Sequence, residues 1–63
     1  MPKITLKAAR VNAGLSQKEA AQMVGVAEST LRNWEAGRTF PNQPKIEKLC
    51  EVYNISFDAL FFA

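Results

Sequence analysis

The sequence predicts one all-α domain that spans residues 1–63 and contains five short helices. Hydrophobic residues make up 48% of the chain and charged residues 22%, a balance typical of globular proteins. Apolar residues recur at helical spacing in several short segments, which are separated by glycine, proline and helix-capping residues. The chain has no histidine and a single cysteine, so it offers neither a Cys/His zinc site nor an internal disulfide. Helix packing must therefore stabilise the fold.

The first helix is predicted to follow Thr5, whose hydroxyl can accept a hydrogen bond from a free backbone N–H group of the first turn. Leu6, Ala9 and Ala13 recur at helical spacing and should face the core. Gly14 adopts the left-handed conformation without a steric penalty, so we expect the helix to end there.

The second helix is predicted to begin after Ser16. Glu19 lies three residues later and completes a capping box, in which each side chain accepts a hydrogen bond from the other residue's backbone N–H group. Gly25 can supply the positive φ angle of a sharp turn, and Val26 should then pack into the core. The inward face of this helix comprises Ala20, Ala21 and Val24.

The third helix is predicted to run from about Glu28 to Glu35, with Ala27 as a weak N-cap. Leu31 and Trp34 are three residues apart, so they lie on the same face, which we expect to be buried. The outer face is then polar. It comprises Glu28, Ser29, Arg32 and Asn33.

A loop and a fourth helix should follow. Gly37 ends the third helix, Phe40 is expected to tuck under the fold, and Pro41 prevents helical continuation. Pro44 suits the first turn of the next helix, where its missing N–H group costs no hydrogen bond. The apolar face of that helix comprises Ile46, Leu49, Cys50 and Tyr53. We expect the thiol of Cys50 to be buried and unreactive.

Ser56 is the expected N-cap of a fifth helix, from Phe57 to about Phe61. This end of the chain has more apolar surface than so small a core needs. The residues concerned are Phe57, Leu60, Phe61 and Phe62. Either a second subunit covers them in a homodimer, or the chain is a domain excised from a longer protein.

The second and third helices form a predicted helix-turn-helix unit. Only a few residues, Gly25 among them, separate the two helices, so they cannot lie parallel. The second helix must brace the third at a steep angle. Ala21 has to be small, because a larger side chain would push the third helix away.

In these residues the chain resembles the lambda-repressor-like family, also called the Cro/repressor or XRE-type helix-turn-helix proteins. The similarity extends from Leu6 to Leu60, and the combined pattern is specific although each piece alone is weak. The residues that carry it are Leu15 to Ala21, Val24 to Val26, Ser29 to Leu31, Trp34 to Arg38, Pro44 and Ile46 to Ile55. The resemblance implies a lambda-repressor-like DNA-binding domain whose third helix enters the major groove of double-stranded DNA.

The resemblance also implies which side chains meet DNA. The base-reading positions are Glu28, Ser29, Arg32 and Asn33. The backbone-contacting positions are Gln17, Lys18, Thr30, Arg38, Thr39 and Asn42. The planar guanidinium of Arg32 can donate two hydrogen bonds to guanine O6 and N7, and the amide of Asn33 can form two hydrogen bonds with adenine. Thr30 is equally suited to a base edge, and Lys18 is equally consistent with a solvated lysine.

Glu28 departs from the amide that is usual in the family. Its carboxylate repels phosphate, so it either accepts a hydrogen bond from the N4 amine of cytosine or pairs with a nearby cation. A second expected ion pair is structural. Arg10 and Glu35 match the family positions at which an arginine of the first helix pairs with the glutamate that ends the third.

The expected assembly is a homodimer on a pseudo-palindromic operator, with the two third helices about 34 Å apart. The charge distribution is consistent with DNA as partner. Residues 1–38 hold six basic and three acidic side chains, whereas residues 39–63 hold two basic and three acidic ones. The basic part should face the polyanion.

Together these features predict a transcriptional regulator, and they favour a repressor from a phage, a mobile element or a bacterial operon. The alternative is a protein-interaction module, such as an antitoxin, that uses the same helix face. An enzyme is not expected, because the chain has no histidine, no glycine-rich phosphate loop and no evident pair of carboxylates. No metal, cofactor or small-molecule ligand is expected either. The longest apolar run, Ala59 to Ala63, is too short to span a bilayer, and the chain begins without a signal-peptide pattern, which predicts a cytoplasmic protein.

Overall fold

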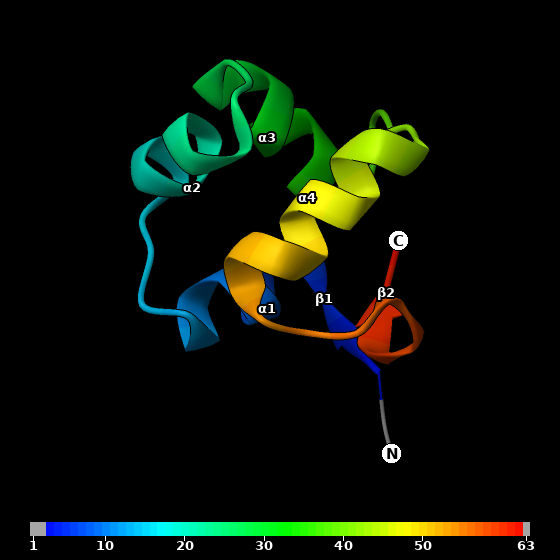
Figure 1. Cartoon of the computed structure of the whole chain (residues 1–63). Coiled ribbons are helices and arrows are strands. Elements are labelled where there is room, and N and C mark those ends of the chain that lie inside the picture. Colours follow the sequence, from blue (N-terminus) through cyan, green and yellow to red (C-terminus); the bar gives the residue numbers. More distant parts are fainter. Residues whose placement is uncertain (1–2, 63) are drawn as a thin grey trace.

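A computed structural model describes residues 3–62, and within them four α-helices surround one apolar core (Figure 1). Two short strands, which lie near the ends of the chain, pair beside the helices. In chain order the elements are β1 (Ile4–Thr5), α1 (Leu6–Asn12), α2 (Gln17–Val24), α3 (Glu28–Glu35), α4 (Gln43–Tyr53), the 3-10 turn η1 (Phe57–Ala59) and β2 (Leu60–Phe61). No helix among these residues is both long and apolar enough to cross a membrane.

The predicted N-caps of α1 and α2 are confirmed. Thr5 Oγ1 accepts a hydrogen bond from the N–H group of Ala8 at 3.1 Å. Ser16 Oγ accepts from the N–H group of Glu19 at 3.0 Å, and Glu19 Oε1 accepts from the N–H group of Ser16 at 3.0 Å. The capping box therefore satisfies two of the free N–H groups at the start of α2. As predicted, Ala27 gives α3 no side-chain cap.

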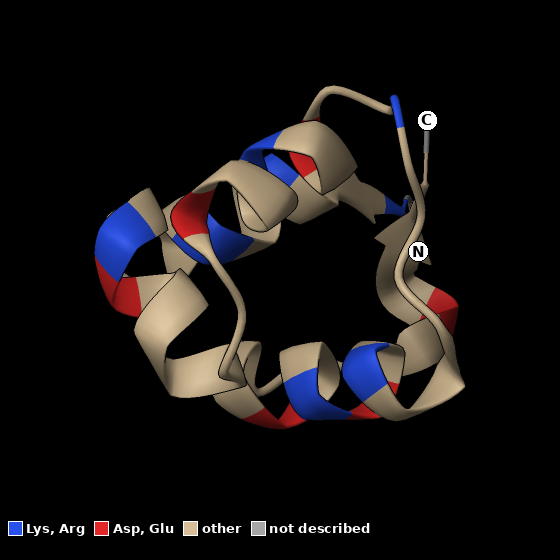
Figure 2. Ribbon diagram, turned by 90° about the horizontal axis from the view of Figure 1, so that it is seen from above, with Lys and Arg blue, Asp and Glu red and all other residues tan. Residues whose placement is uncertain are grey.

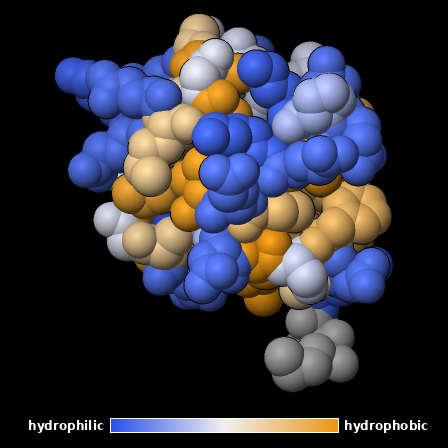
Figure 3. Space-filling view, in the orientation of Figure 1, coloured by the Kyte–Doolittle hydropathy of each residue, from blue (hydrophilic) through white to orange (hydrophobic). Residues whose placement is uncertain are grey.

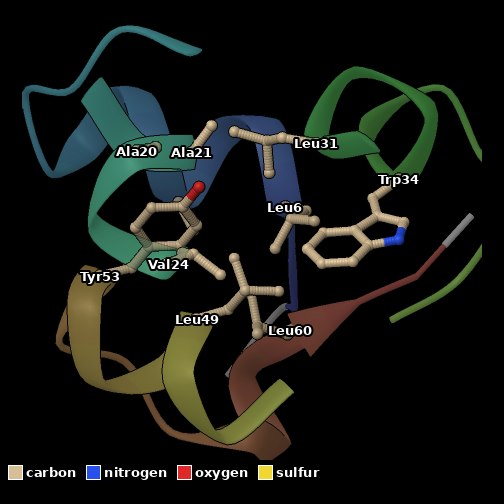
Figure 4. Close-up of a cluster of buried hydrophobic side chains, with 10 residues drawn as sticks. Leu6, Ala20, Ala21, Val24, Leu31, Trp34, Leu49, Tyr53 and Leu60 are labelled. Atoms are coloured by element: carbon tan, nitrogen blue, oxygen red, sulfur yellow. The ribbon is translucent and has the colours of Figure 1, made fainter. Parts of the chain in front are cut away.

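The core is built mainly from the predicted faces of the helices (Figure 4). Its buried members are Leu6, Ala9, Ala20, Ala21, Val24, Leu31, Trp34, Leu49, Tyr53 and Leu60. Ile46, Cys50 and Val26 are only half-buried. Ala13, which was expected to face the core, is exposed, because α1 ends at Asn12 and the chain turns outward there.

The prediction for Phe40 is wrong. Its side chain is 61% exposed, and the following residue, Pro41, is buried instead. In this loop the buried apolar residue is the proline, which lies one residue before Asn42, the N-cap of α4. Pro44 lies in the first turn of α4 as predicted, and Asn42 caps this helix by accepting a hydrogen bond from the N–H group of Lys45 at 3.2 Å.

The predicted fifth helix is also wrong. Only the 3-10 turn from Phe57 to Ala59 forms, without a side-chain cap from Ser56, and the chain then extends into β2. β2 pairs in parallel with β1, with Ile4 opposite Leu60 and Thr5 opposite Phe61. The physical reason is that strand pairing provides hydrogen-bond partners for the backbone N–H and C=O groups and also buries the side chain of Leu60. A short isolated helical turn would achieve neither.

Candidate nucleic-acid interface

A tight turn sets α3 against α2. Gly25 has φ of 89°, and its N–H group donates to Ala21 O at 2.8 Å while the N–H group of Val26 donates to the same oxygen at 3.0 Å. These two hydrogen bonds to one carbonyl oxygen end α2, and the chain then turns toward α3. Ala20 and Ala21 on α2 are both buried, so a larger side chain at either position would have to displace its neighbours.

The packing directs one face of α3 into the core and the other outward. Leu31 and Trp34 are buried, as predicted. Glu28, Ser29 and Arg32 are exposed and Asn33 is half-buried, so the structure brings the four residues predicted to read bases together on the surface. Their roles toward DNA remain predictions. Figure 2 shows acidic and basic segments next to one another along the helices, rather than a face of one sign.

Two interactions link polar residues on this surface. Arg32 Nη2 lies 3.3 Å from Glu28 Oε2, one helical turn away. Arg38 Nη1 donates a hydrogen bond to Asn33 Oδ1 at 3.4 Å. Of the two roles predicted for Glu28, pairing with a nearby cation is the one found in the free protein.

A buried polar cluster fixes the C-terminal end of α3. Arg10 Nε lies 2.7 Å from Glu35 Oε2, and Arg10 Nη2 donates to Glu35 Oε1 at 3.3 Å. The side chains of Arg10 and Glu35 are only 10% and 4% exposed. Arg10 Nη1 also donates to Leu15 O at 2.9 Å, which ties the loop after α1 to the cluster. The ion pair implied by the family resemblance is thus confirmed.

Gln17 belongs to the same cluster, a contact that was not predicted from the sequence. Its Nε2 donates to Glu35 Oε1 at 3.0 Å. The side-chain amide that was predicted to reach a phosphate is therefore hydrogen-bonded to Glu35 in the free protein. To contact a phosphate, this side chain would have to rotate away from Glu35. Otherwise the free backbone N–H groups at the start of α2 would make the contact. The one feature of the sequence that hints at this hydrogen bond is the amide side chain at the first position of α2, the helix that packs against α3.

The other predicted backbone-contacting residues lie around α3. Lys18 is exposed in the first turn of α2, and Thr30 is half-buried on α3. Arg38 and Thr39 are exposed in the loop after α3, where Arg38 reaches back to Asn33. Asn42 is exposed as well, but its side-chain oxygen already caps α4.

A small cavity lies elsewhere in the molecule, between α1 and the end of α4. Its volume is about 230 Å³, and its lining residues are Ile4, Ala9, Asn12, Ala13, Tyr53, Asn54 and Ile55. None of these lies on α3. Residues 3–62 contain no grouping of three or more His, Cys, Asp or Glu side chains that would suit a metal ion.

Comparison with protein families matches residues 6–60 to the family described as Helix-turn-helix. The chain belongs to the lambda-repressor-like helix-turn-helix family. It is 40% identical over 55 residues to the HTH-type transcriptional regulator ImmR of Bacillus subtilis (strain 168). That match covers 87% of this chain and 43% of the relative, so the helix-turn-helix domain spans less than half the length of this regulator.

Proposed function

We propose that this helix-turn-helix domain binds double-stranded DNA in a sequence-specific manner and regulates transcription, with α3 in the major groove. The observation that carries the proposal is the two-sided character of α3. Leu31 and Trp34 anchor one side in the core, while Glu28, Ser29, Arg32 and Asn33 stand on the other. An α-helix fits the major groove, where base edges present distinct patterns of donors and acceptors.

In this proposal Glu28, Ser29, Arg32 and Asn33 read base edges, with Arg32 on a guanine and Asn33 on an adenine. Contacts to the phosphate backbone fix the register of the domain on DNA. They come from Gln17, Lys18, Thr30, Arg38, Thr39 and Asn42. The first turn of α2 adds free N–H groups and the positive end of the helix dipole, both of which favour a phosphate.

We further propose that the protein acts as a homodimeric repressor of a phage, mobile-element or bacterial operon in the cytoplasm. Phe57 and Phe61 support a dimer, since these large apolar side chains of η1 and β2 are 55% and 52% exposed. Figure 3 shows hydrophobic side chains around the strand pair, below a hydrophilic band over α4. A second copy that covers this surface would place two α3 helices on a pseudo-palindromic site.

The experiment is selection of duplex oligonucleotides from a random pool, followed by affinity measurements on the selected sequence. We expect one consensus with two related half-sites, and affinity that falls steeply as salt rises from about 50 to 200 mM because counterions are released. A partner protein bound by the same face, as in an antitoxin, would not require this salt dependence. Failure of the pool to yield any preferred sequence would refute the proposed function.

A further inference from the structure

Two of the four outward residues of α3 form an ion pair with each other. Arg32 Nη2 lies 3.3 Å from Glu28 Oε2, and the side chains are 54% and 44% exposed. Both groups therefore stand at the surface that the proposed function places against DNA. A carboxylate alone is unfavourable there, because phosphates repel it. The guanidinium of Arg32 neutralises it.

The ion pair leaves both groups able to form further hydrogen bonds. A guanidinium has five N–H donors in a planar fork, and a bidentate contact to guanine O6 and N7 uses two of them. A carboxylate has about four lone-pair positions, so the ion pair with Arg32 leaves room for an amine. Arg32 can thus hold Glu28 and a guanine at the same time.

We propose that Glu28 and Arg32 read two adjacent base pairs as one unit. Arg32 binds a guanine, and Glu28 orients the guanidinium while it accepts a hydrogen bond from the exocyclic amine of a cytosine or an adenine in the next pair. Guanine and thymine present acceptors to the major groove at this place, so the carboxylate rejects them. Adjacent pairs are within reach because the two head groups lie 3.3 Å apart, close to the stacking distance of about 3.4 Å between base pairs.

This inference rests on the proposed function, since it assumes that α3 faces base edges. Its test uses the selected duplex and every single-base-pair substitution of it, with the wild type, Glu28→Gln, Arg32→Ala and the double variant. Glu28→Gln keeps the length of the side chain and removes its charge. We expect it to reduce discrimination at the amine-bearing base by about tenfold, a typical value for losing a charged hydrogen-bond partner.

The decisive result is the effect at the neighbouring guanine. If the pair acts as a unit, Glu28→Gln also reduces guanine discrimination by at least about threefold, and the double variant loses less than the product of the two single effects. Arg32→Lys, which keeps the positive charge but lacks the planar fork, should lose discrimination at both positions.

The matched control is Glu51→Gln on α4. Glu51 Oε1 lies 3.6 Å from Lys48 Nζ in an exposed ion pair, so this variant changes the net charge equally but leaves α3 intact. We expect it to leave base preference unchanged. The inference is overturned if Glu28→Gln strengthens binding to all duplexes by one factor, since Glu28 then only masks Arg32, or if the effects of the two single variants multiply. Absence of any consensus with the wild type would instead refute the proposed function itself, and the inference with it.

Discussion

Gln17 Nε2 lies 3.0 Å from Glu35 Oε1, and this hydrogen bond connects the first residue of α2 with the last residue of α3. Arg10 holds the same carboxylate from α1. Three helices therefore meet at one buried carboxylate group. The orientation of α3 depends on this cluster as well as on the apolar contacts of Leu31 and Trp34.

Glu35→Ala is expected to lower the free energy of unfolding by about 3 kcal/mol, because it leaves the buried guanidinium of Arg10 without its anionic partner. Urea denaturation followed by circular dichroism measures the loss. The control is Glu51→Ala, which removes an exposed ion pair and should cost less than about 1 kcal/mol. Equal losses in the two variants would contradict a structural role for the cluster.

Gln17→Ala is expected to weaken binding to all duplexes by the same factor, about tenfold, because a contact to phosphate does not depend on the base sequence. The measurement compares the dissociation constants for the selected duplex and for mismatched ones. Their ratio should equal that of the wild type. A changed ratio would mean that Gln17 contacts a base, or that loss of its bond to Glu35 shifts α3.

Ala21→Leu is expected to destabilise the protein by about 1 to 3 kcal/mol, because the buried alanine has no space for a larger side chain where α2 and α3 pack. DNA affinity should fall further than stability alone explains, since α3 is displaced. Gln22→Leu places the same side chain on an exposed position of α2 and serves as the control. Thermal denaturation and duplex binding of the two variants separate these effects.

Tyr53→Phe is expected to preserve or raise stability at neutral pH. The hydroxyl of Tyr53 is buried, and it has no protein hydrogen-bond partner within residues 3–62. Burial, and to a lesser extent the Glu35 carboxylate, raise the pKa of this hydroxyl to about 12, against an opposing effect of Arg10. The folded protein thus holds the phenol proton more tightly than the unfolded chain, whose tyrosine pKa is about 10.

The stability linked to this proton is complete below about pH 10 and is lost as the pH rises toward 12. Tyr53→Phe should remove that contribution to alkaline unfolding. Urea denaturation of both proteins across this pH range provides the measurement. An identical decline in the wild type and the variant would show that other groups cause it.

Phe61→Ser is expected to shift a dimer toward monomers, because Phe61 is 52% exposed in β2 and contributes to the proposed subunit contact. Sedimentation at micromolar concentration, with and without the selected duplex, reports the oligomeric state. Phe40→Ser is the matched control, since Phe40 is equally apolar and 61% exposed but belongs to the loop after α3. A wild type that remains monomeric both free and on DNA would refute the dimer.

Local signals in the sequence were sufficient to predict the start of α1 and α2 and the buried face of α3. The hydroxyl of Thr5 and the pair formed by Ser16 and Glu19 satisfy N–H groups within one turn, so no distant residue is needed. The spacing of Leu31 and Trp34 likewise determines which face of α3 is buried. These features placed the predicted base-reading residues correctly on the surface.

The errors concern contacts between residues far apart in the chain. Pairing of Ile4 with Leu60 converts the expected fifth helix into a 3-10 turn and a strand, and nothing in the residues around Leu60 reports that partner. The bond between Gln17 and Glu35 is of the same kind. The prediction for Phe40 was wrong for a different reason. Hydrophobicity alone does not indicate which of the two neighbours, Phe40 or Pro41, is buried.

The parallel arrangement of β1 and β2 has a mechanical consequence. Because the strands run in the same direction, Lys3 before β1 and Phe62 after β2 lie at opposite ends of the pair (Figure 1). Tension applied to these two ends loads the hydrogen bonds between the strands in shear, so that they must break together. We therefore expect a force on the two ends to break the strand pair before it unfolds the helices, so that α3 keeps its position until the pair separates.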